Sequence, residues 1–147
     1  MTVTARIESD RPVATLINVF TVEPQRQYEL IALLAHATEE TMKHQPGFIC
    51  ANFHASEDGE RVINYAQWES EAHYRAMLNN PEARIHMNQA ATIAIDVQPR
   101  LFRVASHHPK AGHNAPRNAT APTGTATHAN APSGSASRDQ AAAPSRV

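Results

Sequence analysis

The stretch Asn64-Tyr65-Ala66-Gln67-Trp68-Glu69-Ser70 contains the only tryptophan of the chain, four residues after an asparagine. Its composition is typical of a strand, and strand residues separated by an even number of positions share a face. Asn64 and Trp68 are therefore expected to project from the same face of a sheet. A flat apolar ring beside a fixed amide can hold a planar ligand and polarise one of its oxygens. A packed core tryptophan, with an asparagine satisfied by backbone, is the alternative.

Two further side chains extend this pattern. Asn18 places a second amide in the otherwise apolar run 13–22. A buried polar group without a partner costs about 1–3 kcal/mol, so two amides in neighbouring strands favour a polar cavity over a dry core. Tyr74, six residues after Trp68, falls early in the next helix. Its phenol can reach back over the sheet as a hydrogen-bond donor or a base, or it can simply cap the edge of the core.

The histidines add one candidate and no metal site. His54 ends the second predicted strand near a hairpin, either as a surface residue or as a base at the mouth of a pocket. His36, His73 and His86 fall on helical segments without a metal-ligand motif such as HExxH. No docking signal for an organic cofactor is visible, so none is expected. Amides, an indole and a phenol suit binding an enolic or phenolic substrate, helping it lose a proton, and exposing its carbanion directly to O₂.

Hydrophobic patterns predict the elements that position these residues, in the order β-α-β-β-α-β. Asp58-Gly59 predicts a hairpin turn, and residues 96–99 are expected to break the pattern. This order is the ferredoxin-like α+β plan, with helices over one sheet face. The other face needs a partner, which predicts a homodimer packed sheet against sheet. The predicted strands are 13–22, 48–55, 61–68 and 100–106, and the predicted helices are 25–44, 71–79 and 81 to 91 or 92.

Composition divides the chain near Ser106. Residues 107–147 contain no Leu, Ile, Met or aromatic residue, and such a segment cannot bury enough apolar surface to offset the entropy of ordering it. We therefore predict a flexible N-terminus over 1–11, a folded domain over 12–106 and a disordered tail over 107–147. A folded part of this size is small for an enzyme, and dimerisation would enlarge its core.

Charge and hydropathy exclude several partners. Residues 1–106 carry nine Lys and Arg against thirteen Asp and Glu, without a basic stripe, so no nucleic-acid partner is expected. Cys50 is the only cysteine, which excludes an internal disulfide framework. The N-terminus lacks an apolar secretion signal, and no later run is long enough for a membrane span. A soluble cytoplasmic protein without a membrane partner is the expectation.

The chain resembles the antibiotic biosynthesis monooxygenase domain family over residues 12–106. The resemblance is carried by Ile17-Asn18-Val19-Phe20-Thr21-Val22, by Pro46-Gly47-Phe48, and by the run 64–70 with Tyr74. It implies a homodimeric ferredoxin-like fold, the dimeric α/β barrel. It further implies a monooxygenase that oxidises anthrone-type aromatic polyketides to quinones with O₂ and without metal or flavin, in antibiotic biosynthesis.

The resemblance also implies roles for particular residues. Asn64, Trp68 and Tyr74 match positions that contact the substrate in the family, and we take them as the candidate catalytic residues. The family uses an arginine further along the helical region, where this chain has Asn88, with Arg84 one turn earlier. Arg84 therefore joins the candidate substrate-binding residues, together with Asn18 and His54.

Two other functions remain open from the sequence. One is a ligand-binding or regulatory dimer that keeps the fold and pocket without turnover. The other is haem degradation, because the family also resembles haem-degrading monooxygenases. Those enzymes need a first-strand asparagine, which Asn18 fits, and a helix tryptophan and histidine. The latter positions fall near Met77 and Met87, with His86 one residue away, and a one-residue shift turns a helical side chain by about 100°.

Overall fold

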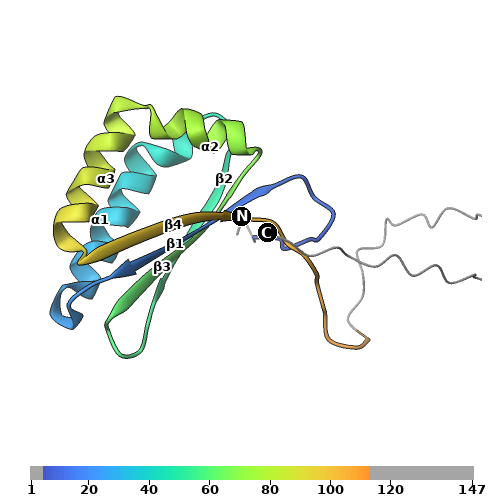
Figure 1. Cartoon of the computed structure of the whole chain (residues 1–147), viewed down its shortest axis with the longest axis horizontal. Helices are drawn as coiled ribbons and strands as arrows, with labels where there is room; N and C mark the ends of the chain where they lie inside the picture. The colour runs from blue at the N-terminus through green and yellow to red at the C-terminus, as the bar shows by residue number, and fades with distance from the viewer. Residues whose placement is uncertain (1–4, 113–147) are drawn as a thin grey trace, which may run out of the picture. The chain divides into compact units, whose positions relative to one another are not determined.

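Four antiparallel strands form one sheet in the computed structural model, which describes residues 5–112 of the chain. The order across the sheet is β2-β3-β1-β4, so β1 and β3 are central (Figure 1). This topology and the helices between the strands confirm the predicted ferredoxin-like α+β fold. The strands are β1 (Ala14–Thr21), β2 (Phe48–Ala55), β3 (Arg61–Trp68) and β4 (Asp96–Phe102).

The chain divides into two compact units, Met1–Pro109 and Lys110–Val147. The first contains the sheet and its helices, and only residues 110–112 of the second are described. The predicted disordered tail therefore lies mostly outside the described residues, as do residues 1–4 of the predicted flexible N-terminus. No helix within the described range has the length and apolar character needed to cross a bilayer.

The α-helices of the described region pack on one face of the sheet, as predicted (Figure 1). In place of the helix predicted at 25–44, residues 24–44 form two short 3₁₀ turns, η1 (Pro24–Arg26) and η2 (Met42–His44), around α1 (Gln27–Glu40). The predicted single helix is thus interrupted at Thr41, whose φ of −128° is not helical. The other two helices are α2 (Glu71–Leu78) and α3 (Pro81–Ile93).

Side-chain caps define where α2 and α3 begin. The Ser70 hydroxyl accepts a hydrogen bond from the backbone N–H of His73, at the start of α2. The side-chain Oδ1 of Asn80 accepts hydrogen bonds from the N–H groups of Glu82 and Ala83, and Pro81 occupies the first helical position of α3. Such caps satisfy donors that a helix leaves unpaired at its N-terminus. The caps fix the start of α2, which carries Tyr74, and the start of α3, which carries His86 and Met87.

The predicted β2–β3 hairpin is confirmed. Gly59 has a φ of +79°, a conformation that glycine adopts without steric cost. The Asp58 carboxylate accepts hydrogen bonds from the Ser56 hydroxyl at 2.7 Å and the Glu60 N–H at 2.9 Å. These bonds lower the pKa of Asp58, with Ser56 the larger cause.

The last strand begins earlier than predicted. The sequence prediction of residues 100–106 is wrong in its bounds, because β4 spans Asp96–Phe102 and includes Pro99, opposite Asn18. Proline cannot donate a ladder hydrogen bond, which is why the local pattern indicates a break at 96–99. An edge strand tolerates proline, since only one of its sides is paired. The correction places Val97 and Pro99 beside the centre of β1.

The core under the helices falls into two clusters. One groups Leu16, Ala66, Trp68, Tyr74, Met77 and Ala83, and the other groups Phe20, Val22, Leu30, Val62 and Ala90. On β1, Asn18 lies between Leu16 and Phe20. On β3, Asn64 lies between Val62 and Ala66. The apolar core is therefore divided by a polar position on each central strand.

Candidate active site

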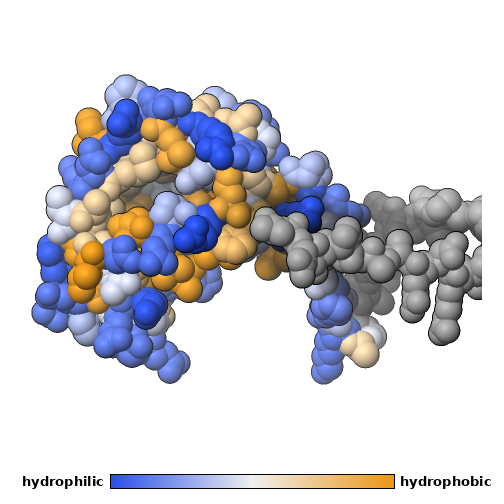
Figure 2. Space-filling view, in the orientation of Figure 1, coloured by the Kyte–Doolittle hydropathy of each residue, from blue (hydrophilic) through white to orange (hydrophobic). Residues whose placement is uncertain are grey.

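A cavity of about 160 Å³ lies between the helices and the sheet. Figure 2 shows the hollow between the helical layer and β4, with hydrophobic side chains around it. Most of its wall is apolar. The lining residues are Leu16, Asn18, Phe20, Leu34, Ala37, Thr38, Met42, Phe48, Ala51, Phe53, Asn64, Ala66, Trp68, Tyr74, Met77, Leu78, His86, Met87, Ala90, Val97 and Pro99.

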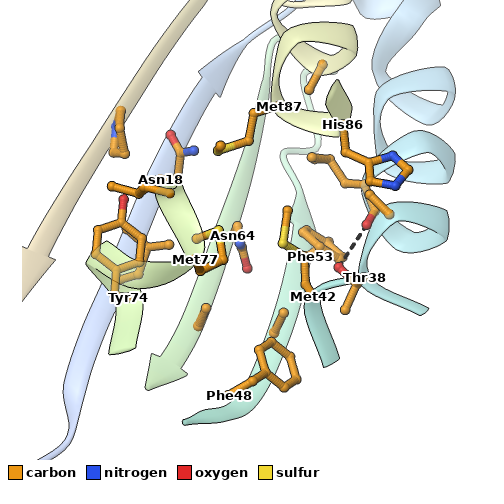
Figure 3. A pocket seen from close by; sticks show the side chains of 18 of the residues that line it. Asn18, Thr38, Met42, Phe48, Phe53, Asn64, Tyr74, Met77, His86 and Met87 are labelled. Atoms are coloured by element: carbon orange, nitrogen blue, oxygen red, sulfur yellow. Dashed lines mark hydrogen bonds between the residues drawn. The ribbon is translucent and has the colours of Figure 1, made fainter. Parts of the chain in front are cut away.

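Asn18 and Asn64 face each other across the two central strands. They are directly paired in the antiparallel register of β1 and β3, so their side chains leave the same face of the sheet and enter the cavity together (Figure 3). Each amide presents both a donor and an acceptor. Both carbonyl oxygens are buried and have no hydrogen-bond partner. The sequence predicted two amides around a polar cavity, and the structure brings these two to one point.

Trp68 and Tyr74 form an aromatic wall at one end of the cavity. Trp68 is 2% exposed, and its ring packs edge-on against Phe48, with centroids 5.4 Å apart, and against Tyr74 at 6.2 Å. The indole Nε1–H is buried without an acceptor. Burial raises the pKa of the Tyr74 phenol above its usual range, an effect that Arg75 partly offsets. Tyr74 is therefore protonated at neutral pH and suited to donating a hydrogen bond rather than to accepting a proton.

His86 is the other titratable side chain in the cavity wall. Its Nε2 lies 3.1 Å from the hydroxyl of Thr41, and its Nδ1 is buried without a partner. The ring of His36 on α1 meets it edge-on with centroids 6.4 Å apart. In Figure 3 the His86 nitrogens turn toward α1, away from the two asparagines. No three His, Cys, Asp or Glu side chains within the described range gather as a metal site would require.

One property separates this cavity from the rest of the described chain. Within residues 5–112, four buried side-chain polar atoms have no hydrogen-bond partner, and all four belong to residues that line this cavity. They are Asn18 Oδ1, Asn64 Oδ1, Trp68 Nε1 and His86 Nδ1. Native proteins satisfy most buried polar groups, and exceptions concentrate where a ligand completes the network. The arrangement is that of a mostly apolar cavity containing hydrogen-bonding groups without partners.

Two of the predicted site residues lie elsewhere. His54 is exposed on the opposite face of the sheet, where its Nδ1 lies 3.2 Å from the Asn52 carbonyl oxygen. Strand parity explains this, because Ala51 and Phe53 are the β2 residues that face the cavity. Arg84 is exposed on α3 and does not line the cavity, and Asn88, one turn later, is also exposed.

The methionines and His86 were not predicted from the sequence as cavity residues. Met42, Met77 and Met87 project from η2, α2 and α3 into the space above the sheet (Figure 3). Their helical spacing indicated only buried faces, and the docking of each helix decides which side chain reaches the sheet. For β2 a signal was available, since the apolar parity of Ala51 and Phe53 indicated the cavity face.

Comparison with known proteins places this geometry in a family. Residues 14–89 match the antibiotic biosynthesis monooxygenase family model. Among characterised proteins, the tetracenomycin-F1 monooxygenase of Streptomyces glaucescens is 44% identical over 90 residues, which cover 61% of this chain and 80% of that protein.

Solved structures agree with this assignment. A monooxygenase of Streptomyces coelicolor, ActVA-Orf6, in complex with nanaomycin D, is 28% identical with a TM-score of 0.61, covering 65% of this chain and 90% of that one. SnoaB of Streptomyces nogalater, a cofactor-independent oxygenase solved in a mutant form, has a TM-score of 0.60 at 21% identity, covering 67% of this chain and 99% of that one. This second likeness is one of fold. Together with the sequence matches, the fold and the strand motif of Asn64 and Trp68 show that the chain belongs to the antibiotic biosynthesis monooxygenase family.

Proposed function

We propose that this chain is a cofactor-independent monooxygenase that uses O₂ to oxidise an aromatic polyketide of the anthrone type to a quinone, in antibiotic biosynthesis. The observation that carries the proposal is the set of four unpartnered polar atoms around one apolar cavity. A planar polycyclic phenol supplies what the cavity lacks: a flat apolar body and oxygens at its rim. The identity to a tetracenomycin-F1 monooxygenase supports the substrate class.

The amides are proposed to hold the substrate oxygens. An amide N–H of Asn18 or Asn64 can donate to a ring carbonyl and stabilise the negative charge that develops when the adjacent carbon loses a proton. The buried indole of Trp68 forms the wall against which the rings lie. Tyr74, whose raised pKa keeps the phenol protonated, is placed to donate a hydrogen bond to a second oxygen.

The proposed reaction needs no redox group from the protein. The substrate methylene loses one proton to water, and the resulting carbanion transfers an electron to O₂. The radical and superoxide then join in a carbon–oxygen bond, and protonation gives a hydroperoxide. Loss of the remaining carbon-bound proton with cleavage of the oxygen–oxygen bond yields the carbonyl and one water. The description of SnoaB, a relative by fold, as cofactor-independent supports this scheme.

We propose that the working form is a homodimer. No helix of residues 5–112 covers the second face of the sheet, where Ile17, Val19, Ile63 and Tyr65 are half-buried. Their pairing across β1 and β3 places all four on one patch. An apolar patch of this kind on a sheet is suited to a second copy of the same surface.

Oxygen consumption tests the proposed activity. Metal-free protein is mixed with dithranol, an anthrone, while O₂ uptake and quinone absorbance are followed. We expect oxidation well above the rate in buffer. The Trp68→Phe variant should lower kcat/KM by at least about tenfold, which corresponds to about 1.4 kcal/mol of transition-state stabilisation, while circular dichroism stays unchanged.

A matched aromatic substitution separates the site from the surface. Tyr28 is 77% exposed on α1, so Tyr28→Phe should leave the rate unchanged. Equal rates in protein and buffer, with the quinone still bound, would instead identify a ligand-binding dimer without turnover. Full activity in Trp68→Phe would remove the role given to the indole.

A further inference from the structure

Methionines gather at the cavity. Apart from Met1, the chain contains three methionines, Met42, Met77 and Met87, and all three line the cavity. Each comes from a different element of the helical layer: η2, α2 and α3. Methionine is unbranched, with three rotatable side-chain bonds, and it adapts its shape to its neighbours more readily than leucine or isoleucine. The side of the cavity formed by the helical layer can therefore change shape more readily than the side formed by the sheet.

Two of these side chains share the cavity wall with the unpartnered amides. In Figure 3, Met87 points toward Asn18, and Met77 and Asn64 both enter the cavity. The two amide oxygens are shielded from solvent and accept no hydrogen bond. A thioether has no proton to donate, so a methionine can exclude water from an amide oxygen but cannot satisfy it. A substrate group that can donate a hydrogen bond would satisfy these oxygens, which a methionine cannot do.

The cavity is also small for a polycyclic substrate. Its volume of about 160 Å³ lies below the roughly 300–1,000 Å³ typical of ligand pockets. The sheet side cannot yield easily, because β1 and β3 are hydrogen-bonded on both sides. The methionine side chains of the helical layer are the part of the lining best able to give a polycyclic substrate additional space.

We propose that Met77 and Met87 determine which aromatic substrates this enzyme accepts. They line the same cavity as Asn64 and Asn18 in the free protein, and a substrate with enough rings and oxygens moves them aside to reach the amides. This inference rests on the proposed function for the class of substrate. The rotamers available to Met77 and Met87 then limit how many fused rings a substrate can have.

Methyl NMR on the full chain tests this directly. Protein labelled with ¹³C at the methionine methyls should give one signal per methionine, four in all, from Met1, Met42, Met77 and Met87. Single Met→Leu variants assign them. The ligand is 1,8-dihydroxyanthraquinone, the quinone of dithranol, and quenching of Trp68 fluorescence reports its binding independently of turnover.

The expected result is a change in the ¹³C shifts of Met77 and Met87 on binding. The ¹³C shift follows the rotamer about the Cγ–Sδ bond, so it reports movement rather than the mere proximity of a ring. Binding without a ¹³C change at either methionine would overturn the inference while leaving the proposed function standing. A ligand that does not bind at all would instead count against both the substrate class of the proposed function and the inference that rests on it.

Stiffening the two side chains gives a second readout. Isoleucine is branched at Cβ and loses rotamer freedom, so Met77→Ile with Met87→Ile should lower kcat/KM for a three-ring anthrone at least about tenfold relative to a two-ring naphthol. Leu33 packs against the core but does not line the cavity, and Leu33→Ile should leave that ratio unchanged. An unchanged ratio in the double methionine variant would contradict the inference.

Discussion

The amide oxygens of Asn18 and Asn64 are buried without a hydrogen-bond partner, which costs the fold stability. A buried acceptor without a partner has lost its bonds to water and gained none from the protein. Both asparagines lie where the surrounding parity on β1 and β3 is apolar, with Leu16, Phe20 and Ala66 as neighbours. An apolar side chain would fit these positions better if folding were the only requirement.

We therefore expect Asn64→Leu to raise stability and abolish turnover together. Removing the unpartnered amide should increase the free energy of unfolding by about 1–3 kcal/mol, measured by urea denaturation, while dithranol oxidation falls to the rate in buffer. Asn52 is the matched control, because it lies on β2 and donates a hydrogen bond to the Tyr65 carbonyl oxygen at 3.0 Å. Asn52→Leu should destabilise the protein, and an equal loss in both variants would show that Asn64 has a partner in solution.

The sequence predicted the site best at single residues of the strands. Even spacing sufficed to place Asn64 and Trp68 on one face, and the cost of an isolated buried amide linked Asn18 to them. It could not show that Asn18 and Asn64 are paired directly, because register depends on where the strands meet rather than on either strand alone. Nor could it show that His86 and the methionines reach the cavity, since helix docking decides that.

At the scale of elements, the contact between α2 and the start of β2 positions the aromatic wall. Gly47 precedes β2 with a φ of +81°, and its carbonyl oxygen accepts a hydrogen bond from the N–H of Glu69 at 2.7 Å. A Cβ at Gly47 would lie 2.3 Å from Cγ of His73. The glycine therefore allows α2, which carries Tyr74, to approach the sheet closely.

We expect Gly47→Ala to cost at least about 2 kcal/mol more than Gly59→Ala. The two glycines have nearly equal φ values, +81° and +79°, so backbone strain is matched between them. A Cβ at Gly59 would lie 3.0 Å from Cβ of Pro24, a milder contact than the 2.3 Å to Cγ of His73 at Gly47, so the difference reports the more severe clash with His73. Thermal or urea denaturation measures it, and kcat/KM should fall as Tyr74 moves. Combining Gly47→Ala with His73→Ala should recover part of the loss. No recovery would mean that the close approach to His73 is not the cause.

Element boundaries could be predicted where a local signal marks both ends. The Asp58-Gly59 turn between two β-rich runs sufficed for β2 and β3, whose predicted limits agree with the structure. The last strand was misplaced because Pro99 is a breaker in a central strand but not at an edge. Edge position is a property of the whole sheet, and no local pattern in residues 96–102 contains it.

At the scale of the whole molecule, the sheet has one face packed by helices and one that no helix of the described residues covers. We expect the protein to sediment as a dimer at micromolar concentration, because the patch of Ile17, Val19, Ile63 and Tyr65 needs cover. Ile63→Glu should give a folded monomer in analytical ultracentrifugation, since it places a charge in the middle of the patch. Ile85 is 57% exposed on α3, so Ile85→Glu is the control and should stay dimeric. A monomeric wild-type protein would refute the expected dimer.

The two outer strands have a consequence for how copies of the chain meet. An unprotected sheet edge is a template for strand addition and for fibril growth. At one edge, β4 has Pro99 near its middle, and at the other, β2 changes register between Phe48 and Cys50. Proline and bulges are features that native sheets use to block such growth. The sheet is therefore a poor seed for amyloid-like extension, and crowding of the folded chain should favour discrete particles over fibres.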